Sequence, residues 1–220
     1  MDLPQLPNVD RLLVTADNPA RIDLSGMDHA RCAALHNYLM HYAWAAEGRP
    51  PAQLRVARRR SPPRFHPSLA VFLDAALVRP VNKQWSENHE GVGPESMFFW
   101  ALGTNEDPEA FFAREDADLH DEDPDSLVCL YWGNEGGGSG GGVYYHQGRH
   151  RAAAFLDMWD HDYAMPAAAH PTLERLFEHW RSLVERGVWA VGPRGVEGTI
   201  DAFKDADTEK WRDYQIPPTW

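Results

Sequence analysis

The stretch "LVCLYWGNEGGGSGGGVYYHQ", residues 127 to 147, places two strand-like apolar runs on either side of a glycine-rich loop. In a dinucleotide-binding protein such a loop opens directly into a helix, whose first backbone amides contact the phosphates. Here Val143 and Tyr144 follow the glycines, and β-branched and aromatic residues favour a strand. A P-loop would need Lys followed by Ser or Thr at these positions. The stretch therefore predicts two antiparallel strands, a connecting loop at residues 136–142 and no cofactor.

Helical periodicity flanks this strand pair on both sides. Ser25 has the N-cap position of a first helix that ends before Gly48, and Pro171 opens another helix that ends at Gly187. A shorter, proline-led helix is predicted between residues 61 and 80. The apolar residues that recur with helical spacing are Cys32, Leu35, Leu39, Tyr42 and Ala46 near the N-terminus, and Leu173, Leu176, Phe177, Trp180, Leu183 and Val184 later in the chain. The sequence therefore predicts an α+β protein, a single domain over residues 1–220 with a mixed or antiparallel sheet flanked by amphipathic helices.

A hairpin is predicted ahead of the first helix, so that residues 9–48 form a possible hairpin–helix subregion. The stretch "RLLVTADNPARIDL", which begins at residue 11, has two strand-like runs around the turn formers Asp17, Asn18 and Pro19. The histidines of the first helix are predicted on or beside its polar flank, with a spacing that does not bring them to one ligand: His29, His36 and His41.

Composition indicates a protein of the cytoplasm. The chain has 220 residues, and its hydrophobic content of 43% is enough for a sizeable core. The first residues, "MDLPQLPNVDR", lack the basic and apolar stretches of a signal peptide, and no apolar run is long enough to span a membrane. Only two cysteines occur, Cys32 and Cys129, and both have the apolar neighbours of buried free thiols.

The net charge of −12 is concentrated in the middle of the chain. Residues 86–135 carry 14 acidic side chains against the single base Arg114, a balance of −13, whereas residues 1–85 have a balance of +4. Such an anionic block weakens binding to nucleic acid and to anionic membranes, and it attracts a basic protein partner. The segment 115–125, "EDADLHDEDPD", has seven acids and too few apolar residues to build a core, so it is predicted to be a solvated loop.

The acidic segment does not match a calcium loop beyond its first residues. Asp121, Asp123 and Asp125 have the alternate spacing with which an EF-hand loop begins. Ser126 then stands where the turn requires glycine, and Trp132 stands where the bidentate Glu would bind. The motif therefore does not predict a metal site.

A metal-dependent, hydrolase-like enzyme is the alternative that the sequence leaves open. Histidines and aspartates are densest between residues 146 and 170, where a two-His, one-carboxylate site could assemble. His146 and His150 have the spacing of a zincin pair, but Gly148 lies between them and no Glu follows the first His. Whether the members of the group converge on a metal is left open by the sequence: His146, His150, Asp157, Asp160, His161, Asp162 and His170.

The order of elements resembles the SUKH superfamily of α+β proteins. The resemblance covers residues 66–186 and rests on helices followed by the paired strands of "LVCLYWGNEGGGSGGGVYY" and then by the helix "HPTLERLFEHW". Many members are immunity proteins of bacterial polymorphic toxin systems, which act through a surface and share no catalytic residues. The resemblance implies a cytoplasmic protein that binds a cognate toxin and blocks its active site.

Charge and resemblance together favour a binding protein over an enzyme. We expect a basic toxin or effector as the partner, and we expect neither nucleic acid nor membrane to bind. A structural or scaffold subunit is a further alternative. The predicted partner-binding surface has an acidic rim with aromatic anchors, the anchors acting only where they are exposed: Glu115, Asp116, Asp118, Asp121, Glu122, Asp123 and Asp125 in the rim, and Trp132, Tyr144 and Tyr145 as anchors.

Overall fold

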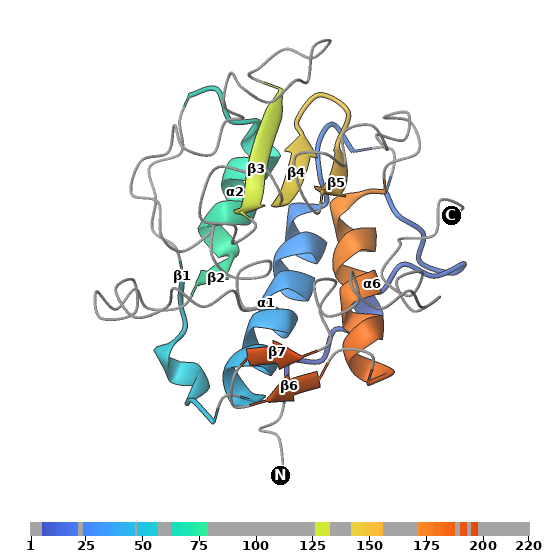
Figure 1. Cartoon of the computed structure of the whole chain (residues 1–220). Helices are drawn as coiled ribbons and strands as arrows, with labels where there is room; N and C mark the ends of the chain where they lie inside the picture. The colour runs from blue at the N-terminus through green and yellow to red at the C-terminus, as the bar shows by residue number, and fades with distance from the viewer. Residues whose placement is uncertain are drawn as a thin grey trace.

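The structure is a computed structural model that describes residues 6–21, 24–46, 48–56, 63–78, 126–132, 142–155, 171–187, 190–192 and 195–197. Its main helices are α1 (His29–Ala46), α2 (Pro67–Ala75) and α6 (Leu173–Glu185). Its main strands are β3 (Leu127–Trp132), β4 (Gly142–His146) and β5 (Arg151–Phe155). The chain therefore has the α+β class that the sequence predicts (Figure 1).

Two further strand pairs and two short 3-10 helices complete the described elements. Strand β1 (Arg55–Val56) pairs with β2 (Leu77–Val78), and β6 (Ala190–Gly192) pairs with β7 (Gly195–Glu197), both antiparallel. The 3-10 helices are η1 (Asp10–Leu12) and η2 (Pro51–Gln53).

The central sheet is antiparallel, with the strand order β3-β4-β5. Leu127 lies opposite His146 and Trp132 lies opposite Gly142, so β3 and β4 form the two arms of a hairpin. The glycine-rich stretch thus joins antiparallel strands, as predicted, although residues 133–141 lie outside the described part of the chain. A helix does not follow the glycines, because β4 begins at Gly142 itself.

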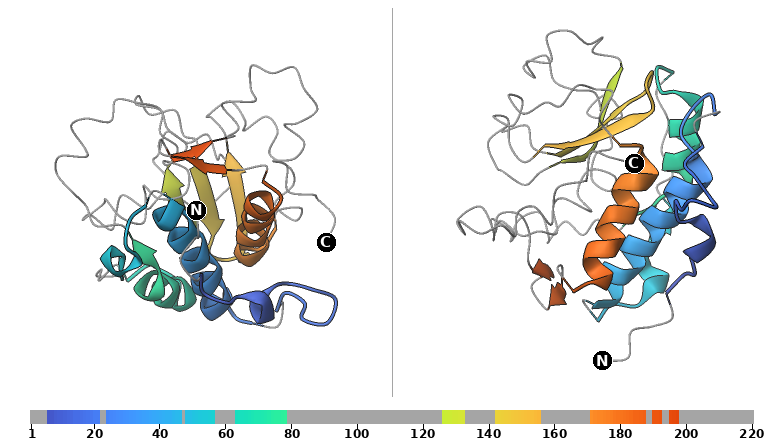
Figure 2. Two further views of the ribbon diagram at one scale, coloured as in Figure 1. Left: turned by 90° about the horizontal axis from the view of Figure 1, so that it is seen from below. Right: turned by 90° about the vertical axis from the view of Figure 1, so that its right-hand side faces the viewer.

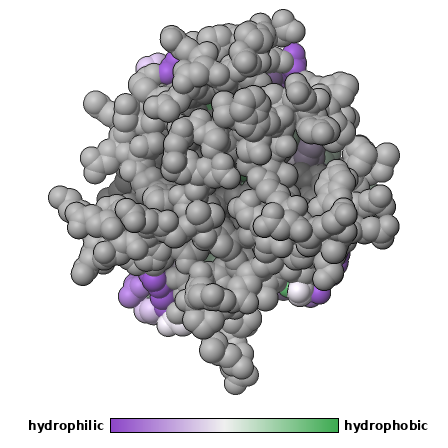
Figure 3. Space-filling model, viewed as in Figure 1, coloured by the Kyte–Doolittle hydropathy of each residue, from purple (hydrophilic) through white to green (hydrophobic). Residues whose placement is uncertain are grey.

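The three helices form a layer on one face of this sheet, with α1 between α2 and α6 (Figure 2). Alternation along the strands turns one set of side chains toward that layer, and Val128, Leu130 and Val143 are fully buried there. From the helices, Leu35, Leu69, Phe72, Leu173, Leu176, Phe177 and Leu183 enter the same hydrophobic core. The described residues that reach the surface in Figure 3 are mainly hydrophilic.

Helix α1 is the central element of the layer. Two predictions for it, the N-cap residue and the position of His36, were wrong. An amphipathic helix capped by Ser25 was predicted, but the helix begins at His29 and is capped by Asp28, whose Oδ1 accepts a hydrogen bond of 3.2 Å from the backbone N–H of Arg31. Because neighbouring elements cover α1 from several sides, the His36 side chain is 98% buried and does not lie on a polar flank. Its Nε2 is 2.8 Å from the carbonyl oxygen of Leu77.

The predicted N-terminal hairpin is wrong in its first strand and right in its turn, and its second predicted strand lies partly outside the described residues. Within residues 6–21 the chain forms η1 and irregular structure without a strand. Thr15 and Asn18 exchange two backbone hydrogen bonds of 3.1 and 3.2 Å, which close the expected turn. The segment packs on α1 and α6 through side chains, which supply the polar contacts that a second strand would have provided.

The helix predicted between residues 61 and 80 is shorter than expected at both ends. It begins at Pro67, with His66 as its N-cap, and it ends at Ala75. Leu77 and Val78 form β2 instead, where they pair with β1. Helix α6 matches its prediction closely, and Gly187 ends it with a φ of 69°. No helix in the described part of the chain is both long and apolar enough to cross a bilayer.

Candidate functional site

Most of the predicted site residues fall outside the described residues. This is true of the whole acidic rim and of five members of the histidine–aspartate group: Glu115, Asp116, Asp118, Asp121, Glu122, Asp123 and Asp125, then Asp157, Asp160, His161, Asp162 and His170. Of the predicted anchors, Trp132 is the last residue of β3.

The two tyrosines of β4 lie on opposite faces of the sheet. Tyr145 points into the core with no exposed surface, so it does not meet the condition of exposure set for an aromatic anchor. The reason is the alternation of the strand, which puts Tyr145 on the same face as the buried Val143. Tyr144 is half-buried. Tyr145 therefore belongs to the core and not to a partner-binding surface.

His146 and His150 do not form the pair that their spacing suggested. The ring Nδ1 of His146 accepts hydrogen bonds from the backbone N–H groups of Gly148 and Arg149, at 3.1 and 3.2 Å. His146 therefore caps the turn between β4 and β5. His150 ends that turn, with its N–H bonded to the His146 carbonyl oxygen at 2.8 Å and with a φ of 54°.

His150 is paired instead with His66, the N-cap residue of α2. The two ring centroids are 5.0 Å apart, and the planes cross at 68°. The Nδ1 atom of His150 is 2.9 Å from the Tyr145 hydroxyl, and Nδ1 of His66 is 2.8 Å from Oγ of Ser68. We call His66 and His150 the imidazole pair. No local spacing could have revealed it, because its members come from different elements far apart in the sequence.

Buried polar and steric contacts hold the imidazole pair in place. The side chain of Gln147, 94% buried, accepts a hydrogen bond of 2.6 Å from the His66 N–H and donates one of 3.3 Å to the Arg64 carbonyl oxygen. On the other side, a Cβ added to Gly26 would lie 2.4 Å from Oγ of Ser68. The backbone at residue 26 therefore packs directly against the residues that support His66.

The surroundings of His150 and Tyr145 favour the neutral forms of these two side chains. Burial lowers the pKa of His150 below its ordinary value, and the neighbouring basic groups His66, His146 and Arg151 lower it further. Burial raises the pKa of Tyr145 far above its ordinary value, and the neighbouring Cys32 and Glu174 raise this pKa further. The phenol therefore stays protonated, and its hydroxyl is able to donate to His150.

The described residues do not bring three metal-binding side chains together. No group of three or more His, Cys, Asp or Glu residues within them has an arrangement that could hold a metal ion. In the imidazole pair, Nδ1 of His66 also accepts a hydrogen bond of 3.3 Å from the Ser68 backbone N–H, so the hydrogen bonds shown for both rings hold them within the fold, in a half-buried position.

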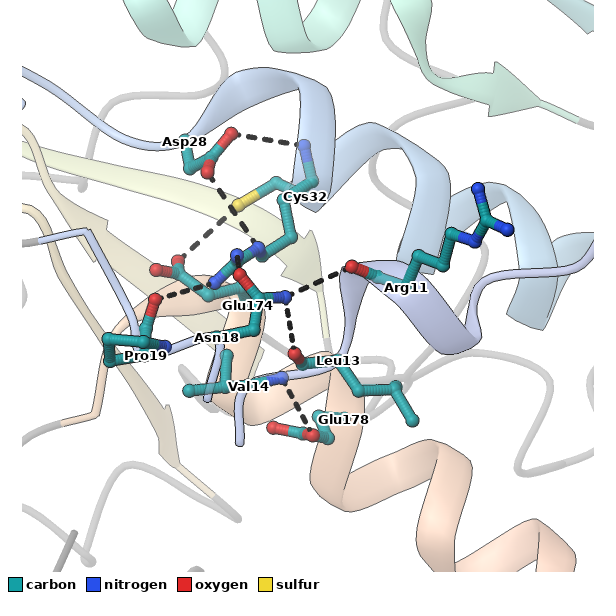
Figure 4. A network of polar contacts seen from close by, with 10 residues as sticks. Arg11, Leu13, Val14, Asn18, Pro19, Asp28, Cys32, Glu174 and Glu178 are labelled. Carbon is teal, nitrogen blue, oxygen red and sulfur yellow. Dashed lines mark hydrogen bonds and ion pairs between the residues drawn. The ribbon is translucent and has the colours of Figure 1, made fainter. Parts of the chain in front are cut away.

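A second polar cluster lies between α1, α6 and the N-terminal segment (Figure 4). The guanidinium of Arg31, 95% buried, donates hydrogen bonds to the Asn18 side-chain oxygen at 2.7 Å and to the Pro19 carbonyl oxygen at 3.2 Å. The Asn18 amide in turn donates to the carbonyl oxygens of Arg11 and Leu13. These bonds tie irregular backbone to the helical layer, so the cluster is structural.

Comparison with known proteins gives no relative: the chain matches no protein-family model, no curated protein and no solved structure.

Proposed function

We propose that this chain is an acidic binding protein of the cytoplasm that neutralises a basic protein partner by occluding its active site, in the manner of an immunity protein. The proposal rests on the distribution of charge along the chain. The resemblance to the SUKH superfamily implies the same class of function.

The excess of negative charge lies outside the described residues. The described residues contain 11 arginines against 8 aspartates and glutamates, a balance of +3, and the rest of the chain therefore has a balance of −15. Of this, −13 falls within the single stretch 86–135. A charge excess concentrated in one stretch supports a localised function more than it supports general solubility.

Concentrated negative charge acts mainly on the rate and the specificity of association. Proteins that cleave nucleic acids need basic clefts, and a polyanionic segment is complementary to such a cleft. Electrostatic steering of this kind raises association rate constants by about 10- to 1,000-fold, and the gain falls steeply with ionic strength. The acidic rim, Trp132 and Tyr144 are the residues that we assign to this contact.

The enzyme alternative receives less support from the described residues. Of the histidine–aspartate group between residues 146 and 170, only His146 and His150 are described. His146 uses its Nδ1 to cap a turn, and His150 faces His66. The two side chains therefore do not share a site.

The decisive experiment measures association with the product of the gene adjacent to that of this chain. In the test variant, four acids of the rim are neutralised: Glu115→Gln, Asp116→Asn, Asp118→Asn and Glu122→Gln. The matched control removes four charges from another stretch: Asp201→Asn, Asp205→Asn, Asp207→Asn and Glu209→Gln. Both variants change the net charge by the same amount, so that only the location of the charge differs.

We expect the rim variant to associate about tenfold more slowly at low salt, with a weaker dependence on ionic strength, while the control variant keeps the wild-type rate within about twofold. Surface plasmon resonance over a series of salt concentrations measures both quantities. Absence of binding to the wild-type chain, or equal rates for the two variants, would contradict the proposal.

A further inference from the structure

We propose that His150 is an acid-sensitive latch, whose protonation releases the turn between β4 and β5 from the N-terminus of α2. The turn consists of residues 147–150, and its contact with α2 is made by the imidazole pair and by the side chain of Gln147. None of these residues belongs to the surface that we assign to the partner, so the latch is independent of the proposed function.

The latch joins two elements that are far apart in the sequence. The Gln147 side chain accepts a hydrogen bond of 2.6 Å from the His66 N–H, and it donates one of 3.3 Å to the Arg64 carbonyl oxygen. The ring of His150 packs against the ring of His66, with centroids 5.0 Å apart. A movement of the turn therefore breaks contacts at the start of α2.

The hydrogen bond between Tyr145 and His150 requires a neutral imidazole. The Tyr145 side chain has no exposed surface, and its hydroxyl lies 2.9 Å from Nδ1 of His150. Because the phenol stays protonated, its O–H donates to the lone pair on Nδ1. A proton on Nδ1 would occupy this lone pair, and the buried O–H would lose the acceptor that His150 supplies, at a cost in free energy. The closed turn therefore favours neutral His150.

The groups whose charge acts on His150 are all basic in the described part of the chain. They are His66 at the start of α2, His146 at the end of β4 and Arg151 at the start of β5. Burial is the largest cause of the lowered pKa of His150, and these three groups lower it further. A positive charge on His150 would therefore be poorly hydrated and repelled by neighbours on three elements.

The partner ring in the latch also accepts a hydrogen bond through Nδ1. As the N-cap residue of α2, His66 accepts the Ser68 backbone N–H at 3.3 Å. A proton on this nitrogen would remove the acceptor of the cap. Both rings of the imidazole pair therefore make their contacts in the neutral form.

His150 has a backbone conformation that its side-chain contacts help to hold. Its φ of 54° lies in the left-handed region, which most side chains other than those of Asn and Asp avoid. Loss of the contacts to Tyr145 and His66 would remove part of the support for this conformation. Protonation of one ring therefore affects the whole turn.

The direction of the pH effect follows from the lowered pKa of His150. Above pH 6.5, the ordinary pKa of histidine, the ring is neutral in both the closed and the released turn, and the contact has its full strength. As the pH falls below 6.5, the released turn binds a proton that the closed turn does not bind. Acid therefore shifts the turn toward its released form.

Hydrogen exchange of the full chain at pH 7 and pH 5 tests the latch. The reporting amide is that of His66, whose N–H is bonded to Gln147, and the reference amide is that of Leu176 in α6. Each observed rate is compared with the intrinsic rate at the same pH, which gives a protection factor for that amide. The reference amide records any general loss of stability in acid.

Three variants identify the titrating group. His150→Asn removes the titration, and its side chain tolerates a positive φ. Tyr145→Phe removes the buried O–H that needs an acceptor. The control is His29→Asn, at an exposed position of α1. Circular dichroism at pH 7 checks that each variant is folded.

Between pH 7 and pH 5, we expect the protection factor of the His66 amide to fall about tenfold more in the wild type than in His150→Asn. Tyr145→Phe should also show a smaller fall than the wild type, and His29→Asn should match the wild type. The change at Leu176 should be the same in the wild type and in His150→Asn. An equal fall at His66 in these two proteins would overturn the proposal.

A measurement on the wild type alone gives a second test. The imidazole ¹⁵N signals of His150 should titrate with a midpoint below pH 6.5, the ordinary value. In Tyr145→Phe the midpoint should move back toward 6.5, because the neutral ring no longer accepts the phenol O–H. A wild-type midpoint at or above 6.5 would overturn the proposal.

Discussion

The side chain of His36 on α1 donates its Nε2–H to the carbonyl oxygen of Leu77 in β2, at 2.8 Å. The ring lies within the hydrophobic core, where it contacts Phe72 edge-on at a centroid distance of 6.0 Å and Phe177 at 5.9 Å. This contact joins the helical layer to the strand that follows α2. It also places a titratable group where a positive charge is poorly solvated.

The burial of His36 predicts a loss of stability in mild acid. Desolvation lowers the pKa of His36 from 6.5 to about 4, although the bond to Leu77 opposes the shift. As the pH falls through 6.5, the unfolded chain binds a proton that the folded chain does not, so His36 should cost about 3 kcal/mol of unfolding free energy by pH 4. Urea denaturation at several pH values measures this slope.

A variant that keeps the hydrogen bond but does not titrate isolates this effect. In His36→Gln the amide is able to donate to Leu77, and the stability should depend less on pH between 6.5 and 4 than in the wild type. His29→Gln, at an exposed position of the same helix, should keep the wild-type slope. The same slope in His36→Gln as in the wild type would show that other groups cause the acid sensitivity.

Asn18 is predicted to be the main polar anchor of the N-terminal segment. Its side chain accepts from Arg31 and donates to two backbone carbonyl oxygens, at 3.0 and 2.8 Å. Asn18→Ala would leave the buried guanidinium of Arg31 with fewer partners, which should cost about 2–3 kcal/mol. Asn8→Ala removes one exposed bond, to the Asp10 N–H, and should cost about 0.5 kcal/mol.

Urea denaturation gives both free energies, and hydrogen exchange locates the effect. Exchange in Asn18→Ala should become faster at Leu13, Val14 and Thr15 before it changes in α6. Equal costs for the two asparagine variants would show that the segment is held by its apolar contacts instead.

The sequence predicted best those elements whose patterns are local. In α6, apolar residues at helical spacing between Thr172 and Gly187 were sufficient, because the helix buries one face only. The hairpin of β3 and β4 was equally recognisable from its two apolar runs and its loop. Helix α1 was harder, since burial on several sides removes the periodicity and hides where His36 points.

The imidazole pair depends on tertiary contacts that no local pattern encodes. His66 was read only as part of a proline-led helix, and His150 only as the second member of a pair with His146. Strand alternation places Tyr145 and Val143 on the same face of β4, so one of them in the core implies the other. The sequence does not say which face of the sheet the helices cover. The contact between His66 and His150 then follows from packing the N-terminus of α2 against the turn between β4 and β5.

Cys32 is predicted to be chemically inert in the folded protein. Burial raises the pKa of its thiol well above the ordinary value, and the carboxylates of Glu174 and Asp28 raise it further, against a smaller lowering by Arg31. Its Sγ lies 3.6 Å from a Glu174 oxygen and is fully buried. In a Cys129→Ala variant, alkylation at pH 8 should be at least about 100-fold slower in the folded than in the unfolded state. Rapid alkylation of the folded variant would show that this buried layer opens readily.

Gly26 is predicted to tolerate no side chain, because the backbone there lies against the support of the imidazole pair. A Cβ at this position would lie 2.4 Å from Oγ of Ser68 and 2.8 Å from Cε1 of His66. Gly26→Ala should therefore force these groups apart and cost about 1–3 kcal/mol of unfolding free energy. Gly148→Ala is the matched control, since its Cβ would lie 3.4 Å from the nearest atom, Cε1 of His146, which is an ordinary van der Waals contact, and it should cost less than about 0.5 kcal/mol. Urea denaturation of both variants compares the two positions directly, and a cost for Gly26→Ala no larger than that for Gly148→Ala would mean that residues 26 and 68 are not in contact in solution.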